Sequence, residues 1–299
     1  MTDQLKNKFD RPPQWGLPYL LSLPALLALI GILYPFILGV YYTFTNYNLT
    51  TSGNIEWIGL TNYIEIFSQT EFWKALEITS IFALSVVIIE LSLGLSIAML
   101  LNDRFPGVQI LRALLIIPMM IPPIVSALMW KVILIPTNQG VLNYFLSSLG
   151  LDPIAWLGDS GTALISMIII DVWIYSPFAI LIFIAGLQSL PKEPYEAARV
   201  DGASGWFVFR KLTLPLLAPN IVLITLFRLI DSLKVFDIIY ATTKGGPASA
   251  TATLHIVSYF EAFRWNNIGR SMVYLFILWI LCFLFAKFLS RLWNRMLMR

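Results

Sequence analysis

The chain has 299 residues, of which 58% are hydrophobic and 12% are charged, with a formal net charge of +3. Its mean hydropathy of +0.77 and its charged content, about half the roughly 25% of an average soluble domain, exclude a soluble globular protein. The basic residues lie between apolar segments, so they do not indicate a nucleic-acid-binding patch. The single cysteine, Cys282, allows no intramolecular disulfide.

The first apolar run extends from Leu17 to about Phe44 and follows three basic residues. A secretory signal peptide has a shorter apolar part, about 7 to 15 residues, and a small-x-small cleavage pattern that this sequence lacks. We interpret the run as an uncleaved membrane-spanning helix.

Six apolar runs are long enough to cross the ~30 Å hydrocarbon core of a bilayer. They cover about residues 17–44, 74–101, 112–134, 162–187, 220–240 and 268–290. The sequence therefore predicts an all-α membrane protein with six transmembrane helices.

Basic residues predict the orientation of these helices, because cytoplasmic loops carry an excess of Lys and Arg. With the N-terminus inside, the cytoplasmic segments hold Lys6, Lys8, Arg11, Arg104, Arg112, Lys192, Arg199, Arg210, Lys211, Lys287, Arg291, Arg295 and Arg299. The outer segments 45–73 and 135–161 hold none, although a third outer loop near 241–267 holds Lys244 and Arg264. Both termini are therefore predicted to be cytoplasmic. The expected parts are an N-terminal tail (1–16), a first helix with its outer loop (17–72), a core with five helices (73–293) and a C-terminal tail (294–299).

Prolines fall inside two of the expected spans. The third contains Pro118, Pro122 and Pro123, and the fourth contains Pro177. Proline removes a backbone donor and clashes with the preceding turn, so we expect kinks. These kinks are either an ordinary feature of membrane helices or the walls of a central cavity.

Charged residues also fall inside the spans, where each costs at least ~2.5 kcal/mol to insert. Among them are Glu90, Asp171, Arg228, Asp231, Lys234 and Asp237. In the fifth span the four charges alternate in sign at a spacing of three, which predicts pairing along one helix surface. One interpretation is a self-neutralising set that only lets the helix insert.

The other interpretation is a solute site. Asp171, Ile174, Tyr175 and Phe178 share one face of the fourth span, and Arg228, Asp231, Ser232 and Val235 share one face of the fifth. Carboxylates and a guanidinium can take vicinal hydroxyls while rings cover an apolar C–H face, so the two stripes suit a polyhydroxylated solute. A metal ion fits poorly, whereas an anionic solute stays open because of Arg228.

Residues 188–219 form a polar interruption before the fifth span. Pro194 suits the first turn of a helix, Gly202 its C-terminal stop and Ser204 the N-cap of a second helix. Pro215 and Pro219 are expected to end that second helix. The small residues and the large aromatics predict a docking element, and the alternative is an amphipathic loop in the lipid interface.

Motifs for catalysis and for cofactors are missing. The sequence has no GxxxxGK[ST] and no HExxH, and its only histidine, His255, has no second histidine for a metal pair. We interpret His255 as an interfacial residue. We expect no catalytic residues, no metal and no cofactor in this chain.

In the cytoplasmic interruption, Glu196-Ala197-Ala198 is followed by Gly202 and then by Leu214-Pro215. This spacing resembles the EAA motif, EAA-x3-G-x9-I-x-LP, of ABC importer permeases, and only Leu212 departs from the pattern by replacing isoleucine. Other segments resemble the carbohydrate-type branch of these permeases. They are Trp57-Ile58-Gly59-Leu60-Thr61-Asn62-Tyr63, Leu100-Leu101-Asn102 with Gly107 and Arg112, and Phe236-Asp237 with Lys244-Gly245-Gly246-Pro247.

The resemblance implies a type I importer fold in which Glu196, Ala197, Ala198, Asp201 and Gly202 couple to a cytoplasmic ATPase. Leu214 and Pro215 would set the exit into the fifth span. It further implies a second homologous permease, two ATPase subunits that bind ATP and Mg²⁺, an extracytoplasmic solute-binding protein and a location in a bacterial or archaeal cytoplasmic membrane. The solute would be a sugar or oligosaccharide, with a polyol or glycerol phosphate as the alternative.

Two other classes of protein remain as rivals. An ion-coupled secondary transporter would use Asp171 or Asp231 as its ion relay. A membrane enzyme is disfavoured by the missing motifs.

Overall fold

The computed structural model describes residues 16–50, 55–103 and 105–297. The predicted N-terminal tail, apart from its last residue, lies outside the described residues, and so do the basic residues Lys6, Lys8, Arg11, Arg104 and Arg299. The predicted orientation of the termini therefore stays a prediction.

Every regular element in the described residues is helical, which confirms the predicted all-α class. The elements are α1 (Gly16–Tyr42), α2 (Thr61–Ser68), α3 (Thr70–Asn102), α4 (Val108–Met120), α5 (Pro123–Ile133), α6 (Val141–Ser148), α7 (Ser160–Ser189), α8 (Glu193–Val200), α9 (Gly205–Val208), the π-helix η2 (Phe209–Thr213), α10 (Leu214–Leu216), α11 (Ala218–Leu233), α12 (Asp237–Thr242), α13 (Leu254–Phe263) and α14 (Ile268–Leu297). Residues 294–297 of the predicted C-terminal tail thus continue the last helix.

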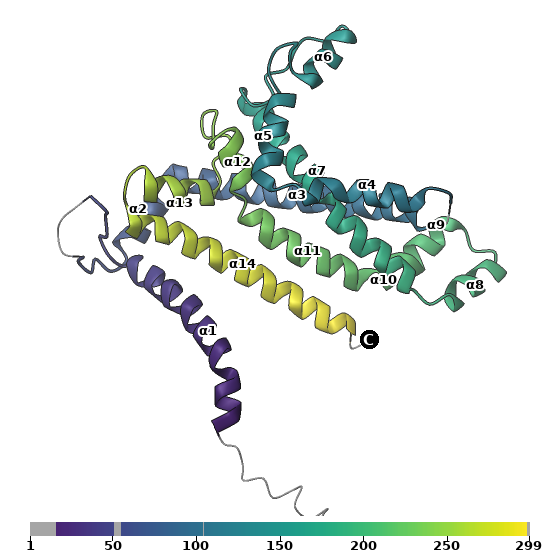
Figure 1. The fold of residues 1–299 in the computed structure, drawn as a ribbon, viewed down its shortest axis with the longest axis horizontal. Coiled ribbons are helices and arrows are strands. Elements are labelled where there is room, and N and C mark those ends of the chain that lie inside the picture. The colour runs from purple at the N-terminus through teal and green to yellow at the C-terminus, as the bar shows by residue number, and fades with distance from the viewer. Residues whose placement is uncertain (1–15, 51–54, 104, 298–299) are drawn as a thin grey trace, which may run out of the picture.

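Four helices, α1, α3, α7 and α14, contain unbroken stretches long and apolar enough to span a membrane. Two further spans are bent: α4 and α5 meet at 97°, and the segments Gly205–Leu216 and Ala218–Thr242 meet at 60°. Counting each bent pair as one span gives the six that the apolar runs predict. Figure 1 shows α8 at one end of the long axis and α2 with α13 at the other.

The break between α4 and α5 is sharper than the expected kink. Ile121 and Pro122 both have extended ψ values, 131° and 135°. Each precedes a proline, whose ring disfavours the α conformation in the residue before it. Pro123 then suits the first turn of α5. Pro118 and Pro177, each without a second proline beside it, stay inside continuous helices.

The centre of the bundle is formed by α3, α7 and α11, which pack against one another. α3 and α7 approach so closely that a Cβ atom added to Gly94 would lie 2.8 Å from the Cβ of Ala179. Only glycine allows this approach. As a result, side chains in the middle of α3 can contact side chains of both neighbouring helices.

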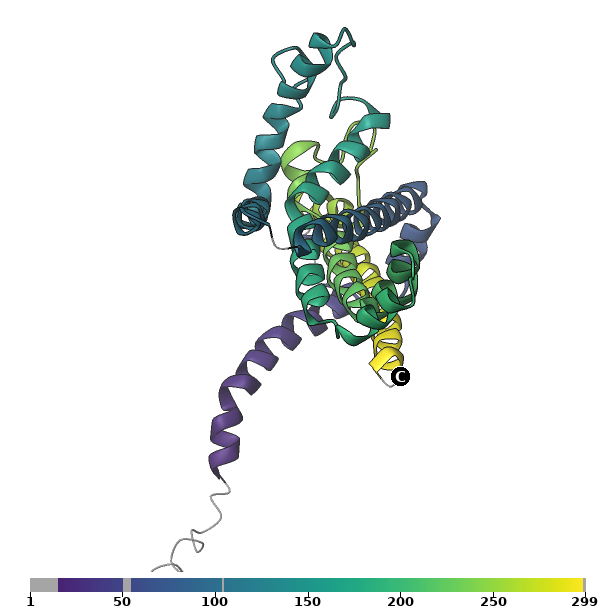
Figure 2. The ribbon, with the colours of Figure 1, turned by 90° about the vertical axis from the view of Figure 1, so that its right-hand side faces the viewer.

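A different role emerges for the segment Trp57–Tyr63. Gly59 turns the chain with a φ of +60°, and Asn62 donates hydrogen bonds to the carbonyls of Thr43 and Thr45 just beyond α1. The segment therefore fastens the end of α1 to α2. The rest of α1 diverges from the bundle (Figures 1 and 2), and its residues 21–37 are nearly all exposed.

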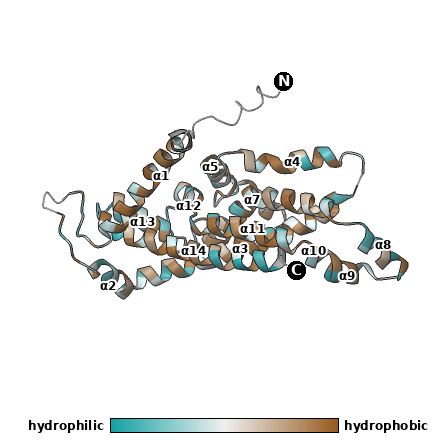
Figure 3. Cartoon of the chain, turned by 90° about the horizontal axis from the view of Figure 1, so that it is seen from below, coloured by the Kyte–Doolittle hydropathy of each residue, from teal (hydrophilic) through white to brown (hydrophobic). Residues whose placement is uncertain are grey.

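Hydropathy follows this architecture. Figure 3 shows hydrophilic residues on α2 and α8 at opposite ends and hydrophobic residues along the long helices between them. This distribution is the one expected of a bundle whose middle lies in lipid.

Candidate functional site

Three buried charged side chains meet at the centre of the bundle. Arg228 on α11 donates from Nε to Glu90 Oε2 on α3 at 2.6 Å, and from Nη2 to Asp171 Oδ1 on α7. All three are buried, and the Arg228 Cζ atom lies 4.1 Å from the centre of the Tyr175 ring. Each charge thus has a partner from another helix, as burial requires.

The predicted pairing along the fifth span is wrong for Arg228 and Asp237. α11 ends at Leu233, so Asp237 belongs to α12 and is not on the same helix surface. Among the four charged side chains of this span, all of which the structure describes, only Asp231 and Lys234 form an ion pair with each other, at 3.6 Å, and both are half-exposed. Residues three apart are neighbours on a helix surface only where the helix is continuous, and α11 ends before Asp237.

The end of α11 opens a cavity. The amide N–H groups of Lys234 and Val235 donate hydrogen bonds to the carbonyls of Asp231 and Ser232, which lie only three residues earlier. The α-helix ends with these two bonds. The Lys234 carbonyl oxygen then lies 2.8 Å from His255 Nδ1 on α13. The break and α13 thereby frame a cavity of about 410 Å³, a size typical of small-molecule sites.

Five of the predicted solute residues line this cavity: Asp171, Tyr175, Arg228, Asp231 and Val235. Residues that the two stripes did not include also line it: Pro123, Lys234, Phe236, Asp237, Ile238 and His255. Lys234, Asp237 and Pro123 were already apparent in the sequence, as charged residues and a proline inside apolar spans. His255 comes from a distant helix, and no sequence signal placed it there.

The other three predicted solute residues do not line the cavity. Ile174 is buried in the core beside α3. Phe178 packs edge-on against Phe227, with ring centres 6.1 Å apart. Ser232 is buried and donates to the Leu229 carbonyl. Helical spacing identifies residues on one face, but that face is wider than the part that meets the cavity.

The cavity carries an excess of acid. Asp171, Asp231 and Asp237 line it with two bases, Arg228 and Lys234, and Glu90 lies behind Arg228. Carboxylates can accept hydrogen bonds from hydroxyl groups, and Arg228 and Lys234 can donate to them. Among the described residues, no group of three or more His, Cys, Asp or Glu side chains could hold a metal ion.

The cytoplasmic segment begins as predicted. Pro194 lies in the first turn of α8, and Gly202 follows the helix with a φ of +67°. The N–H groups of Gly202 and Ala203 donate to Arg199 and Ala198, at 3.2 and 2.9 Å. This is the bonding of a Schellman motif, in which glycine takes the left-handed position. Ser204 caps α9 by accepting from the Phe207 N–H.

The expected end of the second helix at Pro215 is wrong. The chain widens into the π-helix η2 and continues through α10, with Pro215 in the first turn of that element. A proline clashes with the carbonyl four residues earlier, and a wider turn relieves the clash. The helix axis changes only at Leu217, the N-cap of α11, which begins at Ala218 and has Pro219 in its first turn.

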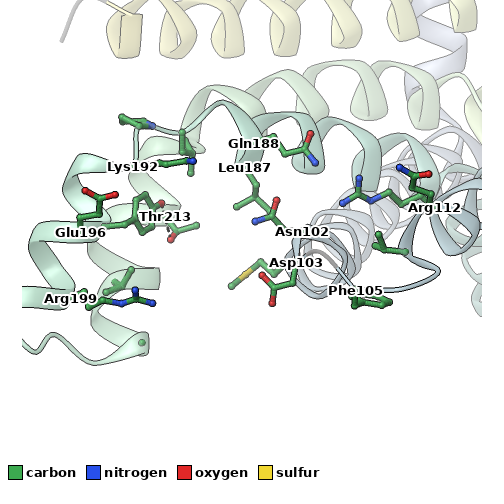
Figure 4. Close-up of a pocket in the computed structure, with 18 of the residues that line it drawn as sticks. Asn102, Asp103, Phe105, Arg112, Leu187, Gln188, Lys192, Glu196, Arg199 and Thr213 are labelled. Carbon is green, nitrogen blue, oxygen red and sulfur yellow. Dashed lines mark hydrogen bonds between the residues drawn. The ribbon is translucent and has the colours of Figure 1, made fainter.

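A large open groove of about 1980 Å³ lies beside α8. Figure 4 shows Glu196 and Arg199 on one side and Asn102, Asp103, Phe105 and Arg112 on the other. The Tyr195 hydroxyl donates to Thr213 Oγ1 at 3.2 Å and fixes α8 against η2. The segment is therefore an ordered protrusion with the open groove along one side of α8.

The predicted coupling residues divide into two groups on this protrusion. Glu196, Ala197, Asp201, Gly202 and Pro215 are exposed, and Glu196 and Gly202 line the groove. Ala198 on α8 is buried and Leu214 on α10 is half-buried, so these two side chains are less accessible to a partner than the other five.

Comparisons with known proteins agree with this geometry. The family model "Binding-protein-dependent transport system inner membrane component" matches residues 90–298. The trehalose/maltose transport system permease protein MalF of Thermococcus litoralis is 39% identical over 85% of this chain and 84% of its own. The probable ABC transporter permease protein y4oQ of Sinorhizobium fredii is 41% identical over 82% of this chain and 79% of its own. The crystal structure of a bacterial ABC transporter that imports alginate has a similar fold, with a TM-score of 0.81 and 21% identity over 93% of this chain and 95% of its own.

Proposed function

The chain belongs to the family of binding-protein-dependent transport system inner membrane components, and we propose that it carries a sugar or oligosaccharide into the cell. It is an ABC transporter permease with several membrane-spanning helices. The observation that supports a carbohydrate is the central cavity, where carboxylates, a guanidinium and aromatic rings meet at the break after α11. The relative from Thermococcus litoralis, described as a trehalose/maltose permease, supports the same class of solute.

The proposed partners follow from the family. They are a second permease, two ATPase subunits that bind ATP and Mg²⁺, and an extracytoplasmic solute-binding protein, all at the cytoplasmic membrane of a bacterium or archaeon. In this proposal the chain carries out no chemical step. The residues Glu196, Ala197, Ala198, Asp201, Gly202, Leu214 and Pro215 form or support the surface that an ATPase subunit grips.

The proposed mechanism is alternating access. ATP binding draws the two ATPase subunits together, and α8 moves with the subunit to which it is docked. Because Tyr195 ties α8 to η2, and η2 continues towards α11, this movement reaches the helix that ends at the cavity. ATP thereby changes the populations of outward-facing and inward-facing states.

An anionic polyol or glycerol phosphate is a weaker candidate. Arg228 is already paired with two carboxylates, Glu90 and Asp171. Asp231 and Asp237 add further negative charge to the cavity, against Lys234 alone. The negative charges of a phosphate would be repelled by these carboxylates, whereas the hydroxyl groups of a neutral sugar can donate hydrogen bonds to them.

The solute class is tested with the complete transporter in proteoliposomes. We expect labelled maltose or trehalose to be taken up and unlabelled disaccharide to compete, with little competition from sorbitol or glycerol 3-phosphate. Uptake of glycerol 3-phosphate in preference to both sugars would reverse the assignment.

Asp231 offers a specific test of the cavity. Its side chain lines the cavity and is 58% exposed, so Asp231→Asn removes a charge with little effect on folding. Loss of one charge-assisted hydrogen bond to a solute hydroxyl lowers uptake at low solute concentration by about tenfold.

The matched control for this variant is Asp152→Asn, an exposed acid outside the cavity in the loop after α6. It leaves uptake unchanged. Equal uptake by the Asp231 variant and the wild type, for every sugar tried, contradicts the assignment of Asp231 to the solute.

A further inference from the structure

A continuous row of aromatic rings leads away from the central cavity. Phe236 stacks on Tyr240, with centres 5.1 Å apart and planes inclined by 15°. Tyr259 lies 5.0 Å from Phe236 and 4.9 Å from Tyr240. Phe263 continues the row 4.9 Å beyond Tyr259. We call these four rings the aromatic row.

The aromatic row begins at the cavity. Phe236 lines the cavity, and so does His255, whose ring centre is 5.1 Å from that of Phe236. His255, Tyr259 and Phe263 follow one another at intervals of four along α13, so they share one face of that helix.

The row ends at the opposite side of the molecule from α8. Just after Phe263, Asn267 forms a β-bridge with Asn48, and Arg270 pairs with Glu65 on α2 at 2.8 Å. Figure 1 shows α2 and α13 together at that end. Segment 45–73, which contains α2, is predicted to be outside the cell from its lack of basic residues. The row therefore joins the cavity to the predicted outer surface.

The rings are fixed but not covered. Phe236 and Tyr240 pack against the buried core cluster around Ile238 and Ile256, yet both remain half-buried. Tyr259 donates a hydrogen bond to the Tyr240 hydroxyl at 3.3 Å, and Phe263 is 68% exposed. The row thus presents fixed ring surface and two hydroxyl groups to whatever passes along it.

We propose that the aromatic row is a path for sugar rings between the outer surface and the central cavity. This inference rests on the proposed carbohydrate function. The C–H face of a pyranose can lie on an aromatic ring without a fixed partner for each hydroxyl, so a solute can move from one ring to the next. Tyr240 and Tyr259 can replace some of its lost contacts with water.

The test uses the complete transporter with its binding protein, ATP and labelled maltose or trehalose in proteoliposomes. The measured quantity is solute transported per ATP hydrolysed. Tyr259→Ala should lower this ratio about fivefold, because the ATPase cycle still runs while fewer solute molecules reach the cavity. Tyr259→Phe keeps the ring and should stay within twofold of the wild type.

The matched control is Tyr144→Ala. Tyr144 lies on α6, is 63% exposed and belongs to neither the row nor the cavity. It should leave the ratio unchanged.

Three results would overturn the aromatic row as a solute path. The first is a transport ratio for Tyr259→Ala equal to that of the wild type. The second is failure of Tyr259→Ala to assemble with the second permease on size exclusion, which would assign the rings to a subunit interface. The third is a loss in Tyr259→Phe as large as the loss in Tyr259→Ala. If the wild-type transporter takes up neither sugar, the carbohydrate function itself fails together with the path. Failure of the path alone is therefore distinguishable from failure of the proposed function.

Discussion

Replacing Gly202 by valine should abolish ATP-driven uptake while solute binding by the separate binding protein is unchanged. Gly202 holds a φ of +67° at the end of α8. A β-branched residue in this left-handed conformation is strained by at least about 1–2 kcal/mol, and relief of the strain unwinds the Schellman turn that ends α8. The proposed docking surface then loses its shape.

Asparagine at the same position separates backbone strain from side-chain bulk. No atom would lie within 4 Å of a Cβ atom added to Gly202, so the space around it is open. Gly202→Asn should keep most of the transport, because asparagine tolerates the left-handed conformation. Gly205, with an ordinary φ and equally open space, provides a second control, and Gly205→Ala should behave as wild type.

The measurements for this set are solute uptake and ATP hydrolysis by the same proteoliposomes. Gly202→Val should hydrolyse ATP without uptake, or lose the ATPase subunit altogether. Wild-type uptake by Gly202→Val, or equal loss in the valine and asparagine variants, would show that α8 does not couple through its turn. Glu196→Phe on the exposed flank of α8 should give the same uncoupled result.

The second large effect is expected at Arg228. Arg228→Met leaves Glu90 and Asp171 buried without their shared partner, which costs about 3–5 kcal/mol. Arg228→Lys keeps the charge, but a lysine cannot present the fork of donors that reaches two carboxylates. Both variants should lower the thermal midpoint of the purified protein, methionine more than lysine.

A triple variant separates stability from transport. Glu90→Met, Asp171→Leu and Arg228→Met together replace the buried charges with apolar side chains, and such replacements are often neutral or stabilising. We expect the thermal midpoint to recover while uptake stays lost, because Asp171 and Arg228 line the cavity. Recovery of both the thermal midpoint and uptake would mean that the three charges only neutralise one another and have no role in transport.

The sequence predicts most of the architecture because the bilayer constrains it strongly. A stretch of about twenty apolar residues has few alternatives to a spanning helix. Caps are local as well: Gly202 and Ser204 act within four residues of their own positions, so both were predictable. The tandem prolines at 122 and 123 predicted a kink, but they did not predict its angle of 97°.

The site was less predictable because it depends on contacts between distant segments. Nothing near Arg228 in the sequence shows that Glu90, 138 positions away, takes its Nε–H. The end of α11 at Leu233 contains no proline or glycine, so the predicted pairing of charges ran past it. His255 enters the cavity only because α13 folds back against this break.

The proposed mechanism depends on import of a carbohydrate by this chain through coupling to cytoplasmic ATPase subunits. The most direct measurement is the uptake of labelled disaccharide by proteoliposomes that contain the complete transporter, with binding protein outside and ATP inside. We expect uptake that requires ATP and persists when an uncoupler removes the proton gradient. Uptake that persists without the ATPase subunits and collapses with the uncoupler would contradict it and would identify an ion-coupled transporter instead.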